Sequence, residues 1–195
     1  APMSTVTVVK KGKSVAIAAD TLGKWGSAME PAEYIANHEK IFKVGASYLG
    51  VAGPGVAQQV LQDYFSRQKK TPALDSPESI FKTWVRLHRD LKDRYNLRPE
   101  EQDDDSYESS RMEVLIMNPS GIFGVDPFRT VQVFTRFYAY GSGNQFAMGA
   151  MAALYKTPDL SAEEIAKLGV EAAAEFDDGT GLPLTSYALK LRKRG

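Results

Sequence analysis

The segment from Ser4 to Asp20 most constrains how this chain can fold. Its first part, Ser4 to Val9, is a run of β-branched residues, and Val15 to Ala19 is a second apolar run that ends at Asp20. Because only a short polar turn separates the two runs, they predict an antiparallel β-hairpin. Such a hairpin returns the end of its second strand to the start of its first. We therefore expect the Asp20 carboxylate close to the Ser4 hydroxyl.

A hydroxyl at a chain terminus has a chemical option that other hydroxyls lack. If the residues before Ser4 are removed, its own α-amine, with a pKa of about 8, can activate the hydroxyl without a histidine. Thr5, whose hydroxyl is also expected near Asp20, is the alternative nucleophile if the first turn differs by one residue. The plainer interpretation is structural, because Asp often ends a strand at a turn. On this segment alone the structural interpretation is favoured.

Composition narrows the classes of function. With 195 residues, 43% of them hydrophobic, the chain has the size of one domain with a single core. Lys plus Arg and Asp plus Glu are equal at 24 each, and no basic cluster is interleaved with aromatic residues, so we expect no nucleic-acid partner. The chain has no cysteine and no apolar run of about 18 residues, which argues against a disulfide scaffold and a membrane span. We expect a cytoplasmic protein.

The sequence offers few residues that could bind a metal or another cofactor. The two histidines, His38 and His88, do not stand at metal-ligand spacing with other donors, so we expect no metal, no other cofactor and no Ser-His-Asp triad. His88 lies beside a helical apolar stripe and is expected to be a packed or half-exposed helix residue, not a ligand. Ala1 and Pro2 are expected to be an expression scar in front of a native start at Met3, which leaves a single domain over residues 4–195.

Beyond the hairpin, strand-like and helix-like segments alternate in groups. Residues 23–37 are predicted to be a loop, and the like-charged residues 99–110 a solvated insertion. Runs of strands followed by pairs of helices, without a βαβ rhythm, predict an α+β fold whose antiparallel sheets carry helices on their outer faces. The expected strands are 40–44, 48–52, 112–117, 122–125, 131–140 and 184–191, and the expected helices are 56–68, 76–91, 146–154 and 161–176.

Five separated motifs carry a resemblance to a known family. They are the hairpin that ends at Asp20, Lys40 at the head of the next strand, Ala52-Gly53-Pro54-Gly55, Tyr140-Gly141-Ser142-Gly143, and Asp177-Asp178-Gly179-Thr180-Gly181. With these motifs the chain resembles, over nearly its whole length, the proteasome β-subunit family of N-terminal-nucleophile hydrolases, which includes the bacterial peptidase HslV. Among bacterial branches it is most similar to the betaproteobacterial proteasome homologue. The resemblance implies a four-layer αββα sandwich of two antiparallel sheets flanked by helices.

The resemblance also implies a role for each matching residue. Ser4 stands where the family usually has a threonine nucleophile; serine keeps the hydroxyl and the α-amine but lacks the methyl group that restricts χ1. Lys40 matches the catalytic lysine, whose charge lowers the pKa of the terminal amine and which Asp20 would hold. Lys43 is the next candidate for that role. Gly53 matches the glycine whose backbone N–H forms the oxyanion hole. The residues that match the supporting network around the amine are Ser142, Asp177 and Thr180.

The implied function is a self-compartmentalising endopeptidase of the threonine type, here with serine, that cleaves unfolded polypeptide inside stacked rings. Heptameric rings and an AAA+ unfoldase are the expected partners. The alternative is a catalytically silent ring protein with an assembly or binding role, because Ser4 replaces threonine and three residues precede it. The α-amine of this chain belongs to Ala1, so activity requires release of Met3. An amidase of another N-terminal-nucleophile family shares the chemistry but usually differs in chain order.

Overall fold

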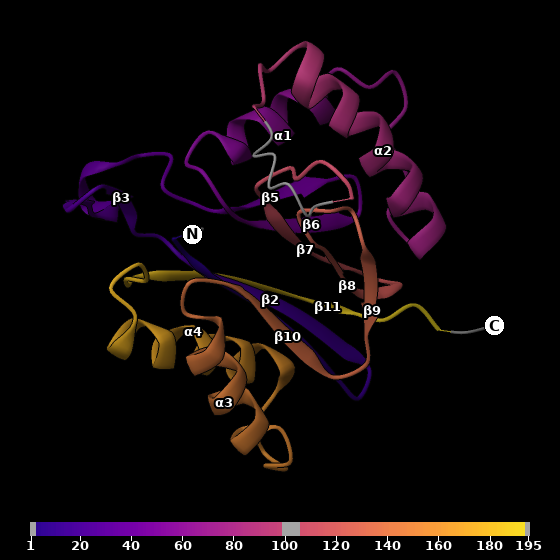
Figure 1. The fold of residues 1–195 in the computed structure, drawn as a ribbon. Helices are drawn as coiled ribbons and strands as arrows, with labels where there is room; N and C mark the ends of the chain where they lie inside the picture. The colour runs from indigo at the N-terminus through magenta and orange to yellow at the C-terminus, as the bar shows by residue number, and fades with distance from the viewer. Residues whose placement is uncertain (1–2, 99–105, 194–195) are drawn as a thin grey trace.

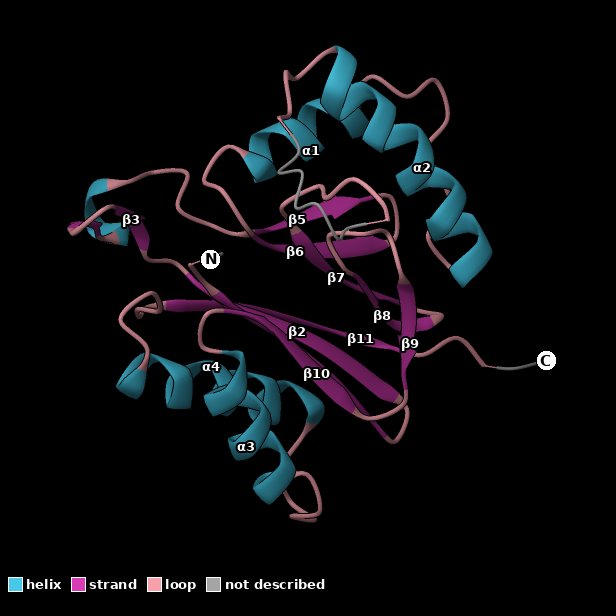
Figure 2. Ribbon diagram, in the orientation of Figure 1, coloured by secondary structure: helices cyan, strands magenta, loops and turns pink. Residues whose placement is uncertain are grey.

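Two antiparallel β-sheets lie face to face at the centre of the computed structural model, which describes residues 3–98 and 106–193. Helices α1 and α2 cover the outer face of one sheet, and α3 and α4 cover the outer face of the other (Figure 1). Figure 2 shows the resulting order of layers, which is the predicted αββα sandwich. The four helices are α1 (Ala57–Ser66), α2 (Pro77–Asp93), α3 (Asn144–Leu154) and α4 (Ala162–Phe176).

The predicted N-terminal hairpin forms the middle of the first sheet. Its strands β1 (Thr5–Lys11) and β2 (Ser14–Asp20) extend further than the apolar runs, because Lys11 still pairs with Ser14 across the turn. Gly12 makes that turn with a φ of 60°, a conformation that favours glycine. Strand β10 (Phe137–Gly141) pairs with β1, and β11 (Leu184–Lys190) pairs with β2, so the order is β10-β1-β2-β11.

The second sheet follows the order of the chain from β5 to β9, and every neighbouring pair is antiparallel. Each strand pairs with the strand next to it in sequence. Short turns connect β5 to β6, β7 to β8 and β8 to β9, whereas α1 and α2 lie in the connection from β6 to β7. The five strands are β5 (Ile41–Val44), β6 (Ser47–Ala52), β7 (Glu113–Asn118), β8 (Gly121–Val125) and β9 (Val131–Phe134).

Two predicted helix starts are confirmed by their caps. The Ser76 hydroxyl accepts the Ser79 N–H at 3.2 Å in front of α2, and the Ser161 hydroxyl accepts the Glu164 N–H at 3.1 Å in front of α4. Each cap satisfies a backbone donor that the first turn leaves free. Two phenylalanines of these helices lie outside the buried faces, since Phe81 of α2 is 50% exposed and Phe176 of α4 is 73% exposed.

Two predictions of secondary structure are wrong. Residues 23–37, predicted as loop, contain strands β3 (Gly23–Trp25) and β4 (Ala28–Glu30) and a short 3₁₀ helix (Ala32–Tyr34). Strands of three residues are too short to show a period of two. Residues 131–140, predicted as one strand, bend at residues 135–136 and divide into β9 of one sheet and β10 of the other.

Some predictions fall wholly or partly on residues outside those that the structure describes. These are the scar at Ala1 and Pro2 and the part of the like-charged insertion at residues 99–105. Of the insertion, Glu108 is described, and its carboxylate lies 3.1 Å from Nε2 of His88. His88 is buried on α2, as predicted. Among the described residues, no helix combines the length and the apolar character needed to cross a membrane.

The two sheets pack through a largely apolar interface. Val6 and Ile17 of the first sheet and Leu115 and Met117 of the second belong to one buried cluster. Gly50 allows the sheets to approach, because a Cβ atom there would lie 2.5 Å from Cγ1 of Val6 and 3.1 Å from Cδ1 of Ile17. The separation of the sheets is therefore set at this point by the absence of a side chain.

Gly50→Ala is expected to destabilise the protein by about 1–3 kcal/mol, because the added methyl group must push the sheets apart. The measurement is the midpoint of denaturant unfolding at a fixed protein concentration. Gly55→Ala is the matched control, since a Cβ atom at Gly55 meets no heavy atom within 4 Å. Equal midpoints for the two variants would show that the sheets tolerate the extra group.

Candidate active site

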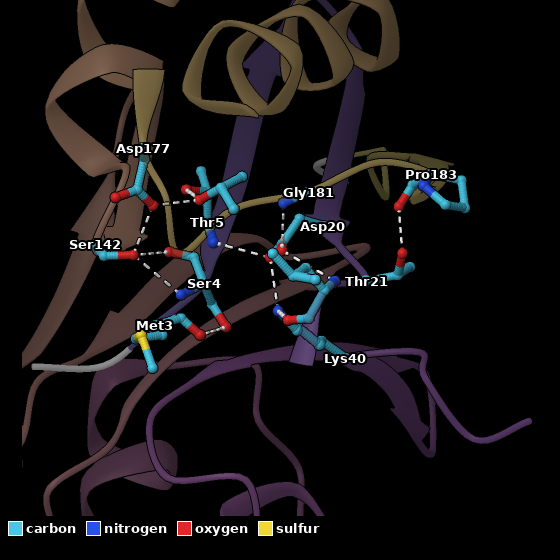
Figure 3. Close-up of polar contacts among 12 residues, drawn as sticks. Met3, Ser4, Thr5, Asp20, Thr21, Lys40, Ser142, Asp177, Gly181 and Pro183 are labelled. Carbon is cyan, nitrogen blue, oxygen red and sulfur yellow. Dashed lines mark hydrogen bonds and ion pairs between the residues drawn. The ribbon is translucent and has the colours of Figure 1, made fainter. Parts of the chain in front are cut away.

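The end of β2 lies beside the start of β1, as the hairpin predicts. The Thr5 N–H donates to Oδ1 of Asp20 at 3.0 Å (Figure 3). In the same view, Ser4 and Thr5 lie between Asp20 and Lys40 on one side and Ser142 and Asp177 on the other. Two pairs of polar side chains, each from distant parts of the chain, therefore lie beside the first residues of β1.

Asp20 is fully buried, and both of its oxygens accept hydrogen bonds. Oδ1 accepts from the Thr5 N–H and from Nζ of Lys40 at 2.8 Å. Oδ2 accepts from the N–H groups of Leu22 at 3.2 Å and Gly181 at 3.0 Å. A buried carboxylate that accepts hydrogen bonds from four donors is held in one orientation.

Lys40 stands immediately before β5 and points its ammonium into the site. Nζ donates to Asp20 and to the carbonyl oxygen of Leu22 at 2.7 Å, and the side chain is 14% exposed. Burial lowers the pKa of Lys40, and the charge and hydrogen bond of Asp20 oppose that shift. Lys43, the other candidate, is exposed, with its ammonium 5.5 Å from the centre of the Tyr48 ring. The contact with Asp20 favours Lys40.

Hydroxyl groups connect Ser4 to Asp177 on the opposite side. The Ser4 N–H donates to Oγ of Ser142 at 3.2 Å, and Ser142 lies 2.7 Å from Oδ2 of Asp177. The Thr180 hydroxyl donates to the same carboxylate oxygen at 2.6 Å, and the hydroxyls of Thr180 and Thr5 are 2.7 Å apart. The nitrogen of Ser4 therefore faces the Ser142 hydroxyl, which is polarised because it donates its own hydrogen bond to Asp177.

The two candidate nucleophiles have different surroundings. The Thr5 side chain is fully buried and bonded to Thr180, whereas Ser4 lines a cleft of about 1260 Å³. The Ser4 hydroxyl donates to the carbonyl oxygen of Met3, and the Ser4 nitrogen is still a peptide amide. Access to the cleft favours Ser4 over Thr5 as the group that meets a substrate.

Gly53 follows the end of β6 and lines the same cleft as Ser4 and Lys40. A Cβ atom at Gly53 would lie 3.2 Å from the carbonyl oxygen of Arg111 and 3.2 Å from Cα of Met112. Such contacts are tighter than usual, so glycine lets the backbone pass close to the start of β7. Hydrogen bonds and ion pairs thus join the other predicted site residues around the start of β1, and Gly53 shares the cleft with Ser4, while the catalytic roles of all seven stay predictions.

Sequence reasoning missed three features of the site. Thr5 is part of the hydroxyl network, and the backbone of Leu22 and Gly181 holds Asp20. Glu113, in the cleft wall, accepts the Gly141 N–H at 3.1 Å. A lone carboxylate on a strand and backbone donors leave no motif in the sequence. Within the described residues, no group of three or more His, Cys, Asp and Glu side chains could hold a metal ion.

Comparison with solved structures decides the family. The chain is 52% identical to Thiobacillus denitrificans BPH, a bacterial proteasome homologue, with a TM-score of 0.94 over 97% of this chain and 100% of that chain. The chain belongs to the family of bacterial proteasome homologues. A structure of Thiobacillus denitrificans BPH in complex with epoxomicin matches with 53% identity, a TM-score of 0.92 and the same coverage. The resemblance to this branch is thereby confirmed.

A more distant comparison extends the fold beyond this branch. Eukaryotic HslV from Trypanosoma brucei matches with a TM-score of 0.66 over 95% of this chain and 99% of that chain, at 19% identity. At that identity the likeness shows the shared fold alone. No protein-family model matches the chain, and no curated protein matches it.

Asp20→Asn is expected to lower the free energy of unfolding by about 3 kcal/mol, because the amide NH₂ must face N–H donors whichever way it turns. Denaturant unfolding at matched protein concentration measures the effect. Asp178→Asn is the control: its side chain is 91% exposed and pairs with Lys24 at the surface, so a change below about 0.5 kcal/mol is expected. Similar losses in both variants would contradict the special role of Asp20.

Proposed function

We propose that this chain is an N-terminal-nucleophile endopeptidase that cleaves unfolded polypeptide with Ser4 inside a chamber of stacked rings. The observation that carries the proposal is the position of Ser4: it lines the cleft, and it lies between the Asp20–Lys40 pair and the Ser142–Asp177–Thr180 network (Figure 3). Membership of the proteasome homologue family supports the same class of reaction. Thiobacillus denitrificans BPH has been solved in complex with epoxomicin, and we propose that this chain binds the same compound.

The mechanism begins with release of Met3, which converts the Ser4 amide into a free α-amine. This amine takes the hydroxyl proton while Oγ attacks the substrate carbonyl, and the N–H of Gly53 stabilises the negative oxygen of the tetrahedral intermediate. When the peptide C–N bond breaks, the ammonium returns the proton to the leaving amine, which leaves an ester on Oγ. Water then hydrolyses the ester, with the α-amine again acting as the base.

Charged neighbours tune the base. The ammonium of Lys40 favours the neutral form of the α-amine, since a second positive charge nearby is unfavourable. Asp20 keeps the lysine in place through the 2.8 Å contact. Ser142 faces the amine nitrogen and can accept a hydrogen bond from it, because the Ser142 hydroxyl donates its own hydrogen bond to Asp177. These groups pre-organise the site without a histidine or a metal ion.

The ring chamber is proposed from exposed apolar surface. On α3, Ala147 and Met151 pack against the core of the chain, while Gly149, Ala152 and Ala153 are exposed. The rings of Phe146 and Phe176 lie nearby, tilted to each other with their centres 5.6 Å apart, and they are 43% and 73% exposed. We propose that neighbouring subunits cover this surface in stacked, heptameric rings. An AAA+ unfoldase is the proposed partner, because a closed chamber admits only extended chains.

Ser4→Ala is expected to abolish cleavage of short fluorogenic peptides, because no other residue supplies both the amine and the hydroxyl. Ser4→Thr is expected to keep or raise the activity, since its methyl group narrows the choice of χ1. A β-lactone probe should label Ser4 in the processed protein, with the adduct located by mass spectrometry and reduced by prior incubation with epoxomicin. Thr5→Val is the matched control and should retain labelling at residue 4.

Two outcomes would contradict this mechanism. An adduct on Thr5 would move the nucleophile by one residue. Absence of both adduct and turnover in protein whose processing to Ser4 is verified by mass would favour the catalytically silent ring protein.

The assembly proposal has a separate test. Phe176→Glu is expected to break the rings into smaller species, because a charge placed in an apolar contact is left without a partner. Multi-angle light scattering at micromolar concentration measures the mass, and Phe81→Glu, at an exposed residue of α2, is the control that should leave the rings intact. A monodisperse monomer for the unaltered chain would exclude the chamber.

A further inference from the structure

Glu113 occupies a position in the cleft that the proposed mechanism does not use. It is the first residue of β7 and lies opposite Ala52, the residue before Gly53. The side chain is half-buried, lines the cleft and accepts the Gly141 N–H on Oε2 at 3.1 Å. This hydrogen bond joins the two sheets, because Glu113 belongs to the second sheet and Gly141 to the first.

Gly141 is in direct contact with the residue that would attack the substrate. It lies opposite Thr5 in the ladder of β1 and β10, and its φ is 102°, which favours glycine. A Cβ atom at Gly141 would lie 2.1 Å from the carbonyl oxygen of Ser4 and 3.4 Å from Cβ of Ala52. The next residue, Ser142, accepts the Ser4 N–H. A shift of the Gly141 peptide would therefore move the hydroxyl that faces the amine.

The environment of Glu113 is more typical of functional sites than of ordinary surface carboxylates. Burial raises the pKa of Glu113, the charge of Asp126 raises it further, and the Gly141 N–H opposes both effects. Burying a carboxylate is unfavourable unless its oxygens accept hydrogen bonds, and carboxylates with perturbed pKa values cluster at functional sites. The backbone bond to Gly141 is the contact that identifies what the acceptor does.

We propose that Glu113 is a positioning residue, whose carboxylate oxygen holds the Gly141 peptide so that Ser142 orients the α-amine of Ser4. This inference rests on the proposed function of Ser4 as an N-terminal nucleophile. In this role Glu113 acts through Gly141 and not on the reacting atoms themselves. Glu113 influences catalysis through its 3.1 Å hydrogen bond with Gly141. The rate should therefore depend on the length of the side chain and on its acceptor oxygen, and not on its charge.

Three variants separate these properties in protein processed to Ser4. Glu113→Ala removes the acceptor, Glu113→Asp keeps the charge but withdraws the oxygen by one methylene group, and Glu113→Gln keeps an oxygen at the same reach without the charge. With a fluorogenic peptide, the Ala and Asp variants are expected to lose about tenfold or more in kcat with little change in KM, because misplaced catalytic groups slow the chemical step. The Gln variant is expected to recover most of kcat.

A second readout does not depend on catalysis. Hydrogen exchange followed by mass spectrometry should show faster exchange in peptides covering residues 139–145 for the Ala and Asp variants, but not for the Gln variant. The matched control is Glu78→Ala, which removes an exposed carboxylate in the first turn of α2 and should change neither readout.

The outcomes distinguish failure of this inference from failure of the proposed function. An active parent enzyme with unchanged kcat in Glu113→Ala would overturn the positioning role. Activity retained by Asp and lost by Gln would overturn it too, because charge rather than the hydrogen bond would then matter. An inactive parent refutes the proposed function, and the exchange measurement then decides for or against the Glu113–Gly141 contact by itself.

Discussion

One buried carboxylate holds together the parts of the chain that form the site. The four donors to Asp20 come from Thr5 at the start of β1, Leu22 after β2, Lys40 before β5 and Gly181 after α4. A charge in such a setting is stable only when its oxygens are fully satisfied, so each segment is fixed relative to the others. The first residue of β1 is thereby positioned before any substrate binds.

The contact between the two sheets is the second constraint. Ser4 and Ser142 belong to the ends of the first sheet, whereas Gly53 and Glu113 belong to the ends of β6 and β7 in the second. Two glycines set how closely the sheets and strands approach, Gly50 within the core and Gly141 beside Ser4. Because close-packed interiors transmit small shifts, a core substitution that changes the separation of the sheets acts on the geometry of the cleft as well as on stability.

Local signals were the ones that could be predicted from sequence. The hairpin and the caps at Ser76 and Ser161 depend on residues a few positions apart, and the structure confirms them. The division of residues 131–140 between two sheets could not be predicted, because the apolar pattern continues across the bend. Glu113 was missed for a related reason: its partner, the Gly141 N–H, is 28 residues away and carries no side chain that could form a motif.

The serine at position 4 is a smaller obstacle to catalysis than the residues before it. Serine has about three χ1 wells where threonine is more restricted, and selecting one of three costs about 0.6 kcal/mol, or roughly threefold in rate. A single oxyanion donor is worth about a hundredfold to a thousandfold. By contrast, the amide nitrogen of Ser4 has no lone pair available to act as a base. The proposed cleavage therefore cannot begin until Met3 is released. In the proposed mechanism, the replacement of threonine by serine therefore matters less for the rate than processing in front of Ser4.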